Sequence, residues 1–66
     1  MEMEQEKGLK RLILDTARQL LTTTGYAQLS MRNIANKIGY SATSIYLYFE
    51  SKDDLVHELI DEGVDL

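Results

Sequence analysis

The sequence predicts a small all-α domain: a bundle of three helices with a helix-turn-helix, followed by the start of a fourth helix. Apolar residues recur at helical spacing in four separate segments of the chain. The 66 residues include no proline and only four glycines, which favours helices over a strand-and-turn architecture. There is no cysteine, so neither a disulfide nor a thiolate metal site reinforces the modest core that this length allows.

The first helix is expected over residues 9–23, after a charged N-terminal arm at residues 1–7. Ile13 and Ala17 fall on one helical face with the leucines that follow them, while most charged side chains lie off that face. Three consecutive threonines then lower the helix propensity, and Gly25 can adopt the left-handed conformation that ends a helix. The pattern therefore predicts that the first helix stops just before Gly25.

The next two helices are expected to form a helix-turn-helix at about residues 30–49, within a domain that covers residues 8–66. The hydroxyl of Ser30 can cap the second helix, and an apolar stripe follows at positions i, i+3, i+4 and i+7. The stripe consists of Met31, Ile34, Ala35 and Ile38. Gly39 is expected to end this helix, and Ser41 can cap the next one.

The third helix has an unusual outer surface. Ile45 and Phe49, four residues apart, are expected to point inward. The residues on or near the outer surface are Thr43, Ser44, Tyr46, Leu47 and Tyr48. A solvated face would more usually carry Glu, Lys, Gln or Arg. Hydroxyls and tyrosines suit a helix in a nucleic-acid groove, where Ser and Thr reach base edges or phosphates and Tyr reaches a phosphate oxygen.

The fourth helix is predicted from Ser51 and Asp54, which resemble a capping box with Asp in place of Glu or Gln. Its apolar stripe consists of Leu55, Val56, Leu59 and Ile60. The chain ends at Leu66 without a cap, so we expect a fragment of a longer protein. In such a fragment, Leu55, Leu59 and Ile60 are expected to be partly exposed.

The charge distribution is compatible with DNA binding, although the formal net charge of −4 opposes it. Between Lys7 and Lys52 there are seven basic and two acidic residues, and the other acidic residues flank this range. Charge alone equally allows an ordinary acidic helical protein. No segment approaches the roughly 20 apolar residues of a membrane span, and the N-terminus lacks the apolar run of a secretory signal. We therefore expect a cytoplasmic protein.

Taken together, these residues resemble the N-terminal DNA-binding domain of the tetracycline-repressor (TetR) family of bacterial transcriptional regulators. The resemblance runs from about Gly8 to the end of the chain and rests on the joint spacing of motifs over four helices. These motifs are Ile13-Leu14, Ala17, Leu20-Leu21, Gly25-Tyr26, Ser30-Met31-Arg32, Ile34-Ala35, Gly39-Tyr40-Ser41, Ile45-Tyr46, Phe49 and Ser51-Lys52.

The departures from the family pattern fall on the recognition helix. The family often has a basic residue and Gly where this chain has Ala42 and Thr43. It often has an aromatic residue and His where this chain has Leu47 and Tyr48. The scaffold is retained while the reading surface is individual, so the target DNA sequence does not follow from the resemblance.

The resemblance implies a DNA-binding surface of ten residues: Ser30, Arg32, Ser41, Ala42, Thr43, Ser44, Tyr46, Leu47, Tyr48 and Lys52. Thr43 and Ser44 are expected at base edges or phosphates, and otherwise are tolerated surface residues. Tyr46 resembles the family's phosphate-contacting tyrosine, and Tyr48 stands where a phosphate-contacting His often lies. Leu47 either meets a thymine methyl group or packs on the edge of the core.

Basic residues at two helix starts complete the expected surface. Arg32 can reach a phosphate or a guanine edge, and Lys52 can bind a phosphate together with the free N–H groups of the fourth helix. Ser30 is expected to cap its helix and can also touch a phosphate. Lys37 is expected to be solvated.

The resemblance also implies partners: double-stranded DNA with a palindromic operator, and homodimerisation of the full-length protein. The family's C-terminal domain, which pairs the subunits and binds a small-molecule inducer, lies outside this chain. The fragment is expected to be a monomer that binds DNA weakly, as the reading head of a repressor. We expect no cofactor, metal or catalytic site, since His57 stands alone. The alternative is a protein-interaction module that uses Tyr46, Leu47 and Tyr48.

Overall fold

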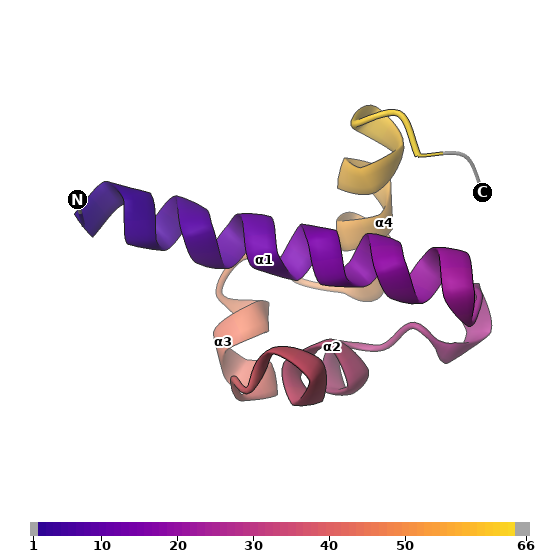
Figure 1. Cartoon of the computed structure of the whole chain (residues 1–66), viewed down its shortest axis with the longest axis horizontal. Helices are drawn as coiled ribbons and strands as arrows, with labels where there is room; N and C mark the ends of the chain where they lie inside the picture. Colours follow the sequence, from indigo (N-terminus) through magenta and orange to yellow (C-terminus); the bar gives the residue numbers. More distant parts are fainter. Residues whose placement is uncertain (1, 65–66) are drawn as a thin grey trace.

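The computed structural model describes the backbone of residues 2–64 and the side chains of residues 8–64. The helices are α1 (Glu2–Thr23), the short 3-10 helix η1 (Tyr26–Gln28), α2 (Met31–Ile38), α3 (Ala42–Tyr46) and α4 (Lys52–Asp61). Residues 2–64 contain no strand, which confirms the predicted all-α class. Helix α1 crosses the whole molecule, with α2 and α3 below it and α4 rising on the other side in the view of Figure 1. The final two residues of the expected domain, Asp65 and Leu66, lie outside the described residues.

The start of α1 differs from the sequence prediction. The helix begins at Glu2, so the segment predicted as a charged arm continues the helix. Met, Glu, Gln and Lys are strong helix formers, and acidic residues near a helix N-terminus interact favourably with its dipole. The charge of this segment was therefore a poor reason to exclude it from the helix. A glycine such as Gly8 inside a helix costs only about 1 kcal/mol relative to alanine. The side chains of residues 1–7 lie outside the described part.

Three threonines end α1 by bonding back to its carbonyls. The Oγ1 atoms of Thr22, Thr23 and Thr24 donate hydrogen bonds to carbonyl oxygens three or four residues earlier, at 2.7–3.2 Å. The Leu20 carbonyl also accepts the N–H groups of Thr24 and Gly25, at 2.8 and 3.2 Å, so the Thr24 hydroxyl is an additional donor to it. Hydroxyls that bond back to the helix in this way slightly destabilise it. Gly25 follows with φ of +92°, in the region that favours glycine, and redirects the chain into η1. The helix therefore stops where the sequence predicts.

One apolar cluster holds α1, α2, α3 and α4 together. Helix α1 contacts η1, α2 and α4. The buried members of the cluster are Ile13, Leu14, Ala17, Leu21, Leu29, Met31, Ile34, Ala35, Ile45, Phe49, Leu55, Val56 and Leu59. The sequence analysis missed Leu29, which precedes the cap of α2. A hydrophobic residue at this position commonly packs against the fourth residue of the helix, here Ile34, and both are buried. That pairing is the signal by which Leu29 was recognisable.

The apolar stripe of α4 is narrower than predicted. Leu55 and Leu59 are fully buried, which contradicts the expectation that they are partly exposed. Ile60 is 45% exposed. At 3.6 residues per turn Ile60 lies about 140° around the helix from Leu55, so it falls at the edge of the face that Leu55, Val56 and Leu59 occupy. Helix α1 packs against α4, and Leu55, Val56 and Leu59 belong to the apolar cluster.

Candidate nucleic-acid interface

Local hydrogen bonds fix α2 at both ends. The Ser30 Oγ accepts a hydrogen bond from the Asn33 N–H at 3.0 Å, which confirms the predicted cap. The Asn33 side chain in turn donates to the Gln28 carbonyl at 2.6 Å and holds the preceding turn. At the other end, Gly39 has φ of +80°, and its N–H donates to the Ala35 carbonyl at 2.9 Å. Helix α2 therefore begins and ends as the sequence predicts.

Helix α3 is shorter than predicted and does not include Leu47 and Tyr48. The Ser41 Oγ accepts from the Ser44 N–H at 3.4 Å, and the two hydroxyl oxygens are 3.3 Å apart. The helix ends at Tyr46, so Leu47 and Tyr48 occupy the turn that follows instead of the helix itself. The Tyr48 N–H still bonds to the Ile45 carbonyl at 2.9 Å. β-branched and aromatic residues are weak helix formers, which is consistent with a helix of this length.

The predicted contact residues differ in exposure. Leu47 is 79% exposed and Tyr46 is 52% exposed. The exposure of Leu47 contradicts the interpretation that it packs on the edge of the core. Thr43 is also exposed, whereas Ala42 and Tyr48 are half-buried and pack against the apolar cluster. The solvent-facing surface around α3 therefore consists of a hydroxyl, an aromatic and an aliphatic side chain.

At the start of α4, the chain forms contacts that the sequence analysis missed. Lys52 Nζ donates a hydrogen bond to the Tyr26 carbonyl at 2.6 Å and lies 3.8 Å from the centroid of the Tyr26 ring. The Tyr26 hydroxyl donates to Asp53 Oδ1 at 2.7 Å, and this bond, with a smaller effect of burial, raises the pKa of Tyr26. The Ser51 Oγ accepts from the Asp54 N–H at 3.3 Å, which confirms the predicted cap.

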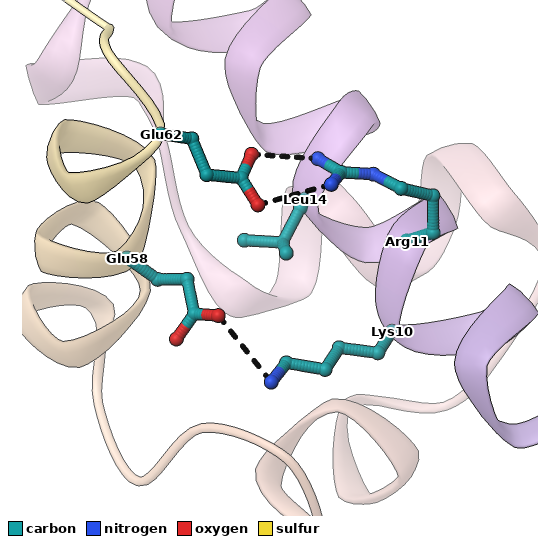
Figure 2. Close-up of a pocket in the computed structure, with 5 residues that line it drawn as sticks. All are labelled: Lys10, Arg11, Leu14, Glu58 and Glu62. Atoms are coloured by element: carbon teal, nitrogen blue, oxygen red, sulfur yellow. Dashed lines mark hydrogen bonds and ion pairs between the residues drawn. The ribbon is translucent and has the colours of Figure 1, made fainter.

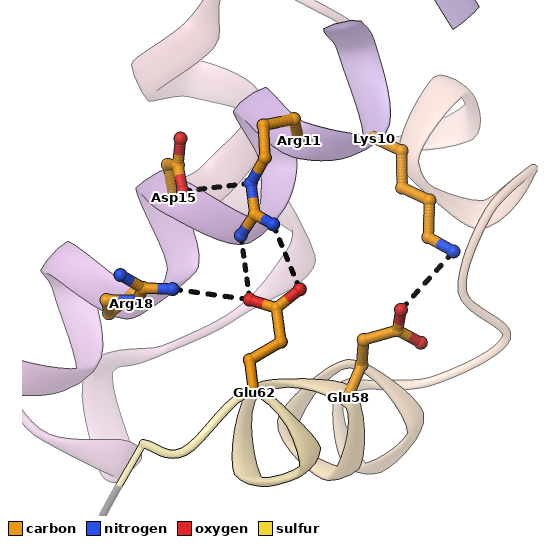
Figure 3. Close-up of polar contacts among 6 residues, drawn as sticks. All are labelled: Lys10, Arg11, Asp15, Arg18, Glu58 and Glu62. Carbon is orange, nitrogen blue, oxygen red and sulfur yellow. Dashed lines mark hydrogen bonds and ion pairs between the residues drawn. The ribbon is translucent and has the colours of Figure 1, made fainter. Parts of the chain in front are cut away.

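Salt bridges join α1 to α4 (Figure 3). The Arg11 guanidinium donates two hydrogen bonds to the Glu62 carboxylate at 2.8 and 3.0 Å. Arg18 reaches the same carboxylate at 3.2 Å, and Lys10 lies 3.3 Å from Glu58. The hydrogen bond from Arg11 lowers the pKa of Glu62, and the same bond raises the pKa of Arg11. Bidentate pairs between an arginine and a carboxylate are the stronger form of ion pair.

These pairs correct the charge argument made from the sequence. The basic middle of the chain was expected to face DNA while the acidic residues at its ends faced elsewhere. In the fold, Glu58 and Glu62 instead form salt bridges with basic residues of α1. Much of that positive charge is therefore neutralised within the molecule. Sequence proximity does not predict this pairing, because Arg11 and Glu62 are 51 residues apart in the chain.

The same residues line a shallow hollow of about 210 Å³ between α1 and α4. Figure 2 shows Lys10 and Arg11 reaching across it toward Glu58 and Glu62, with Leu14 at its floor. Opposite charges therefore meet one another across the hollow. Its chemistry is that of an inter-helix contact.

The basic residues left without an ion pair lie elsewhere. Within residues 8–64 they are Arg32, Lys37 and Lys52. Arg32 lies in the first turn of α2, Lys37 in its last turn, and Lys52 is the first residue of α4. Positive charge that is not neutralised internally therefore lies on the two helices adjoining the α3 segment in the chain.

The sequence is similar to one family of known proteins. The family model described as bacterial regulatory proteins, tetR family, matches residues 13–59. The chain belongs to the TetR family. Membership of this family indicates DNA-binding transcriptional regulation. The family indicates a regulator and not an enzyme, as the sequence predicts.

Individual regulators align with most of the chain. The fatty acid metabolism regulator protein of Bacillus subtilis (strain 168) is 33% identical over 60 residues, covering 91% of this chain and 31% of its own length. An uncharacterised HTH-type transcriptional regulator of Haemophilus influenzae is 34% identical over 60 residues, covering 89% of this chain and 29% of its own length. The HTH-type transcriptional regulator EthR of Mycolicibacterium smegmatis is 41% identical over 49 residues, covering 74% of this chain and 23% of its own length.

The chain spans about a third or less of the length of these TetR-type relatives. No solved structure shows a significant match to the chain. Across the part of the chain that the structure describes, no helix is both long and apolar enough to span a membrane.

Proposed function

We propose that the TetR-family domain binds duplex DNA through α2, α3, the turn after α3 and the first turn of α4. The observation that carries this proposal is that exposed, uncharged side chains occur together with basic residues that no salt bridge neutralises. Thr43, Tyr46 and Leu47 face solvent, while Arg32 and Lys52 lie at the starts of two helices. In helix-turn-helix domains, the second helix of the motif enters the major groove and the first crosses the backbone.

The proposed roles follow from side-chain chemistry. Thr43 and Ser44 contact base edges or phosphates, although the Ser44 hydroxyl also lies within hydrogen-bond distance of Ser41. Leu47 contacts a thymine methyl group. Tyr46 and Tyr48 use their hydroxyls on phosphates. The remaining proposed contacts, Ser30, Ser41 and Ala42, lie at the caps and the start of these helices.

Arg32 and Lys52 supply the proposed electrostatic contacts. Arg32 binds a phosphate or a guanine edge, for which a two-pronged contact is worth about 1–3 kcal/mol of discrimination. Lys52 binds a phosphate with one of the two ammonium protons that its bond to Tyr26 leaves available. The free N–H groups at the start of α4 favour an anion at the same place.

The proposal is tested by removing two charges from each side of the molecule. The affinity of the 66-residue chain for a labelled mixed-sequence duplex is measured by fluorescence anisotropy over a range of salt concentrations. For Arg32→Ala/Lys52→Gln we expect a large loss of affinity and a fall of about 2 in the slope of log K against log salt. The matched control, Lys10→Gln/Arg18→Gln, removes two charges that are paired with α4 and is expected to leave that slope nearly unchanged.

Circular dichroism confirms that each variant is folded before affinities are compared. Equal losses in both double variants would contradict the proposed surface and indicate diffuse attraction to DNA. Absence of binding by the unsubstituted chain at low salt would reject DNA as its partner and favour the protein-interaction alternative, in which exposed Tyr46 and Leu47 contact another protein.

For the longer protein, we propose a homodimer that reads a palindromic operator in the bacterial cytoplasm and acts as a repressor released by a small molecule. Family membership supports this proposal, in which the dimerisation and inducer sites lie in a further domain outside this chain. Two heads reading successive major grooves lie about 34–36 Å apart. A single head lacks the avidity of such a pair, so the isolated chain should be a monomer that binds weakly. A stable dimer with tight, palindrome-specific binding would contradict this expectation, and analytical ultracentrifugation measures it.

A further inference from the structure

We infer that Tyr26 is a positioning residue for DNA binding, because its ring and carbonyl hold the Lys52 ammonium at the start of α4. The inference rests on the proposed function, in which Lys52 contacts a phosphate. Tyr26 lies in η1, outside the helix-turn-helix, and was not among the residues expected at the DNA surface.

The geometry of Lys52 is the first step of the argument. Its Nζ makes two contacts with one residue: the hydrogen bond of 2.6 Å to the Tyr26 carbonyl and the approach to within 3.8 Å of the ring centroid. A cation over an aromatic face is attracted by the negative charge of the π system. A free lysine side chain has many rotamers, and fixing it before DNA arrives reduces the ordering that binding requires.

The neighbouring carboxylate is the second step. Asp53 lies in the first turn of α4, where its charge opposes a phosphate and can also attract Lys52. The Tyr26 hydroxyl donates to Asp53 Oδ1 at 2.7 Å, and within residues 8–64 no salt bridge joins Lys52 to Asp53. One tyrosine thus binds the cation through its ring and carbonyl and the anion through its hydroxyl. The Lys52 ammonium is left with two N–H donors for a phosphate.

A double-mutant cycle on the 66-residue chain tests this inference. Affinity for a mixed-sequence duplex is measured for Tyr26→Leu, Lys52→Gln and the double variant, in parallel with Lys37→Gln and its combination with Tyr26→Leu. We expect Tyr26→Leu to weaken binding about threefold to tenfold in the unsubstituted chain and in the Lys37→Gln background, and to change little once Lys52 is replaced. Tyr26→Phe keeps the ring and should lose less affinity than Tyr26→Leu, and its remaining loss measures the bond between the hydroxyl and Asp53.

A purely structural role for Tyr26 predicts a different result. Tyr26→Leu would then weaken binding by the same factor with and without Lys52, and this outcome would overturn the inference while leaving DNA binding by the domain intact. The cycle thus separates failure of the inference from failure of the proposed function, which is shown by an unsubstituted chain that does not bind DNA. In that case both fall.

A measurement without DNA tests the geometry itself. The ring of Tyr26 should shift the NMR signals of the terminal methylene protons of Lys52 upfield in the free chain. The shift should persist in Tyr26→Phe and disappear in Tyr26→Leu. Signals of Lys52 at their ordinary positions in the unsubstituted chain would overturn the inference before any binding experiment.

Discussion

The two sides of α1 use their polar groups differently. On the side of α4, Lys10, Arg11 and Arg18 are bound to the carboxylates of Glu58 and Glu62 (Figure 3). On the side of α2 and α3, Arg32, Thr43, Tyr46 and Leu47 are exposed. Among the described residues, no salt bridge involves Arg32. The first set of groups links α1 to α4, and we propose that the second meets DNA. Substitutions should therefore separate stability from DNA binding.

The largest expected effect comes from the buried side of α4. Leu59→Ala removes a fully buried side chain and should lower the free energy of unfolding by about 2–5 kcal/mol. Its neighbour offers a matched control, because Ile60 is 45% exposed and Ile60→Ala should cost far less. Urea denaturation followed by circular dichroism measures both. Similar losses in the two variants would contradict the burial difference between these adjacent residues.

A smaller effect, confined to DNA binding, is expected on the other side. Arg32→Ala should weaken binding to the preferred duplex by about 1–3 kcal/mol if Arg32 reads a guanine. The free energy of unfolding should change little, since the side chain is exposed. Lys37→Ala, at the other end of α2, is the control and should affect binding less. A change in stability that accounts for the lost affinity would show that Arg32 belongs to the scaffold.

Leu47 allows a sharper test of the proposed reading surface. Leu47→Ala should weaken binding by about 1 kcal/mol, because truncation removes apolar contact with a thymine methyl. Replacing the contacted thymine by deoxyuridine removes the same methyl group from the DNA and should cause a similar loss. The two changes together should cost no more than either alone. Additive losses at every thymine of the duplex would exclude a methyl contact by Leu47.

The smallest expected effect concerns the pH dependence of the α1–α4 contact. Hydrogen bonding to Arg11 lowers the pKa of Glu62 in the folded chain, below the ordinary value of about 4.3. The contribution of Glu62 is therefore present above that ordinary value and is lost as the pH falls through the lowered folded pKa. Glu62→Gln should be slightly less stable near neutral pH, and the difference should shrink in acid. Thermal unfolding at several pH values measures it, and a difference that grows in acid would contradict the assignment.

The sequence predicted best those features that local rules determine. The caps at Ser30, Ser41 and Ser51 and the turn at Gly39 each depend on a few neighbouring residues, and all are present. The predicted apolar stripe of α2 has Met31, Ile34 and Ala35 buried and Ile38 partly buried against the cluster, because helical periodicity reports on burial. The predicted start of α1 at residue 9 is wrong, because the charged residues before it were interpreted as an arm although they are strong helix formers.

Features that depend on distant residues were not predictable from spacing. The bond between Tyr26 and Asp53 joins positions 27 apart, and that between Arg11 and Glu62 joins positions 51 apart. Periodicity describes one helix at a time and does not say which charged faces meet. For the same reason the sequence left two interpretations of Leu47 open, and only the fold shows that its side chain projects into solvent.

The most direct test is a titration of the ¹⁵N-labelled chain with mixed-sequence duplex DNA, followed by two-dimensional amide NMR at low and then physiological salt. We predict that shifts concentrate at Ser30, Arg32, residues 43–48 and Lys52, and that they fade as salt is raised. Amides near Arg11, Arg18 and Glu62 should move little. Spectra that do not change at low salt, or shifts that concentrate on the α1–α4 side, would contradict the proposed division of the molecule into a stabilising side and a DNA-binding side.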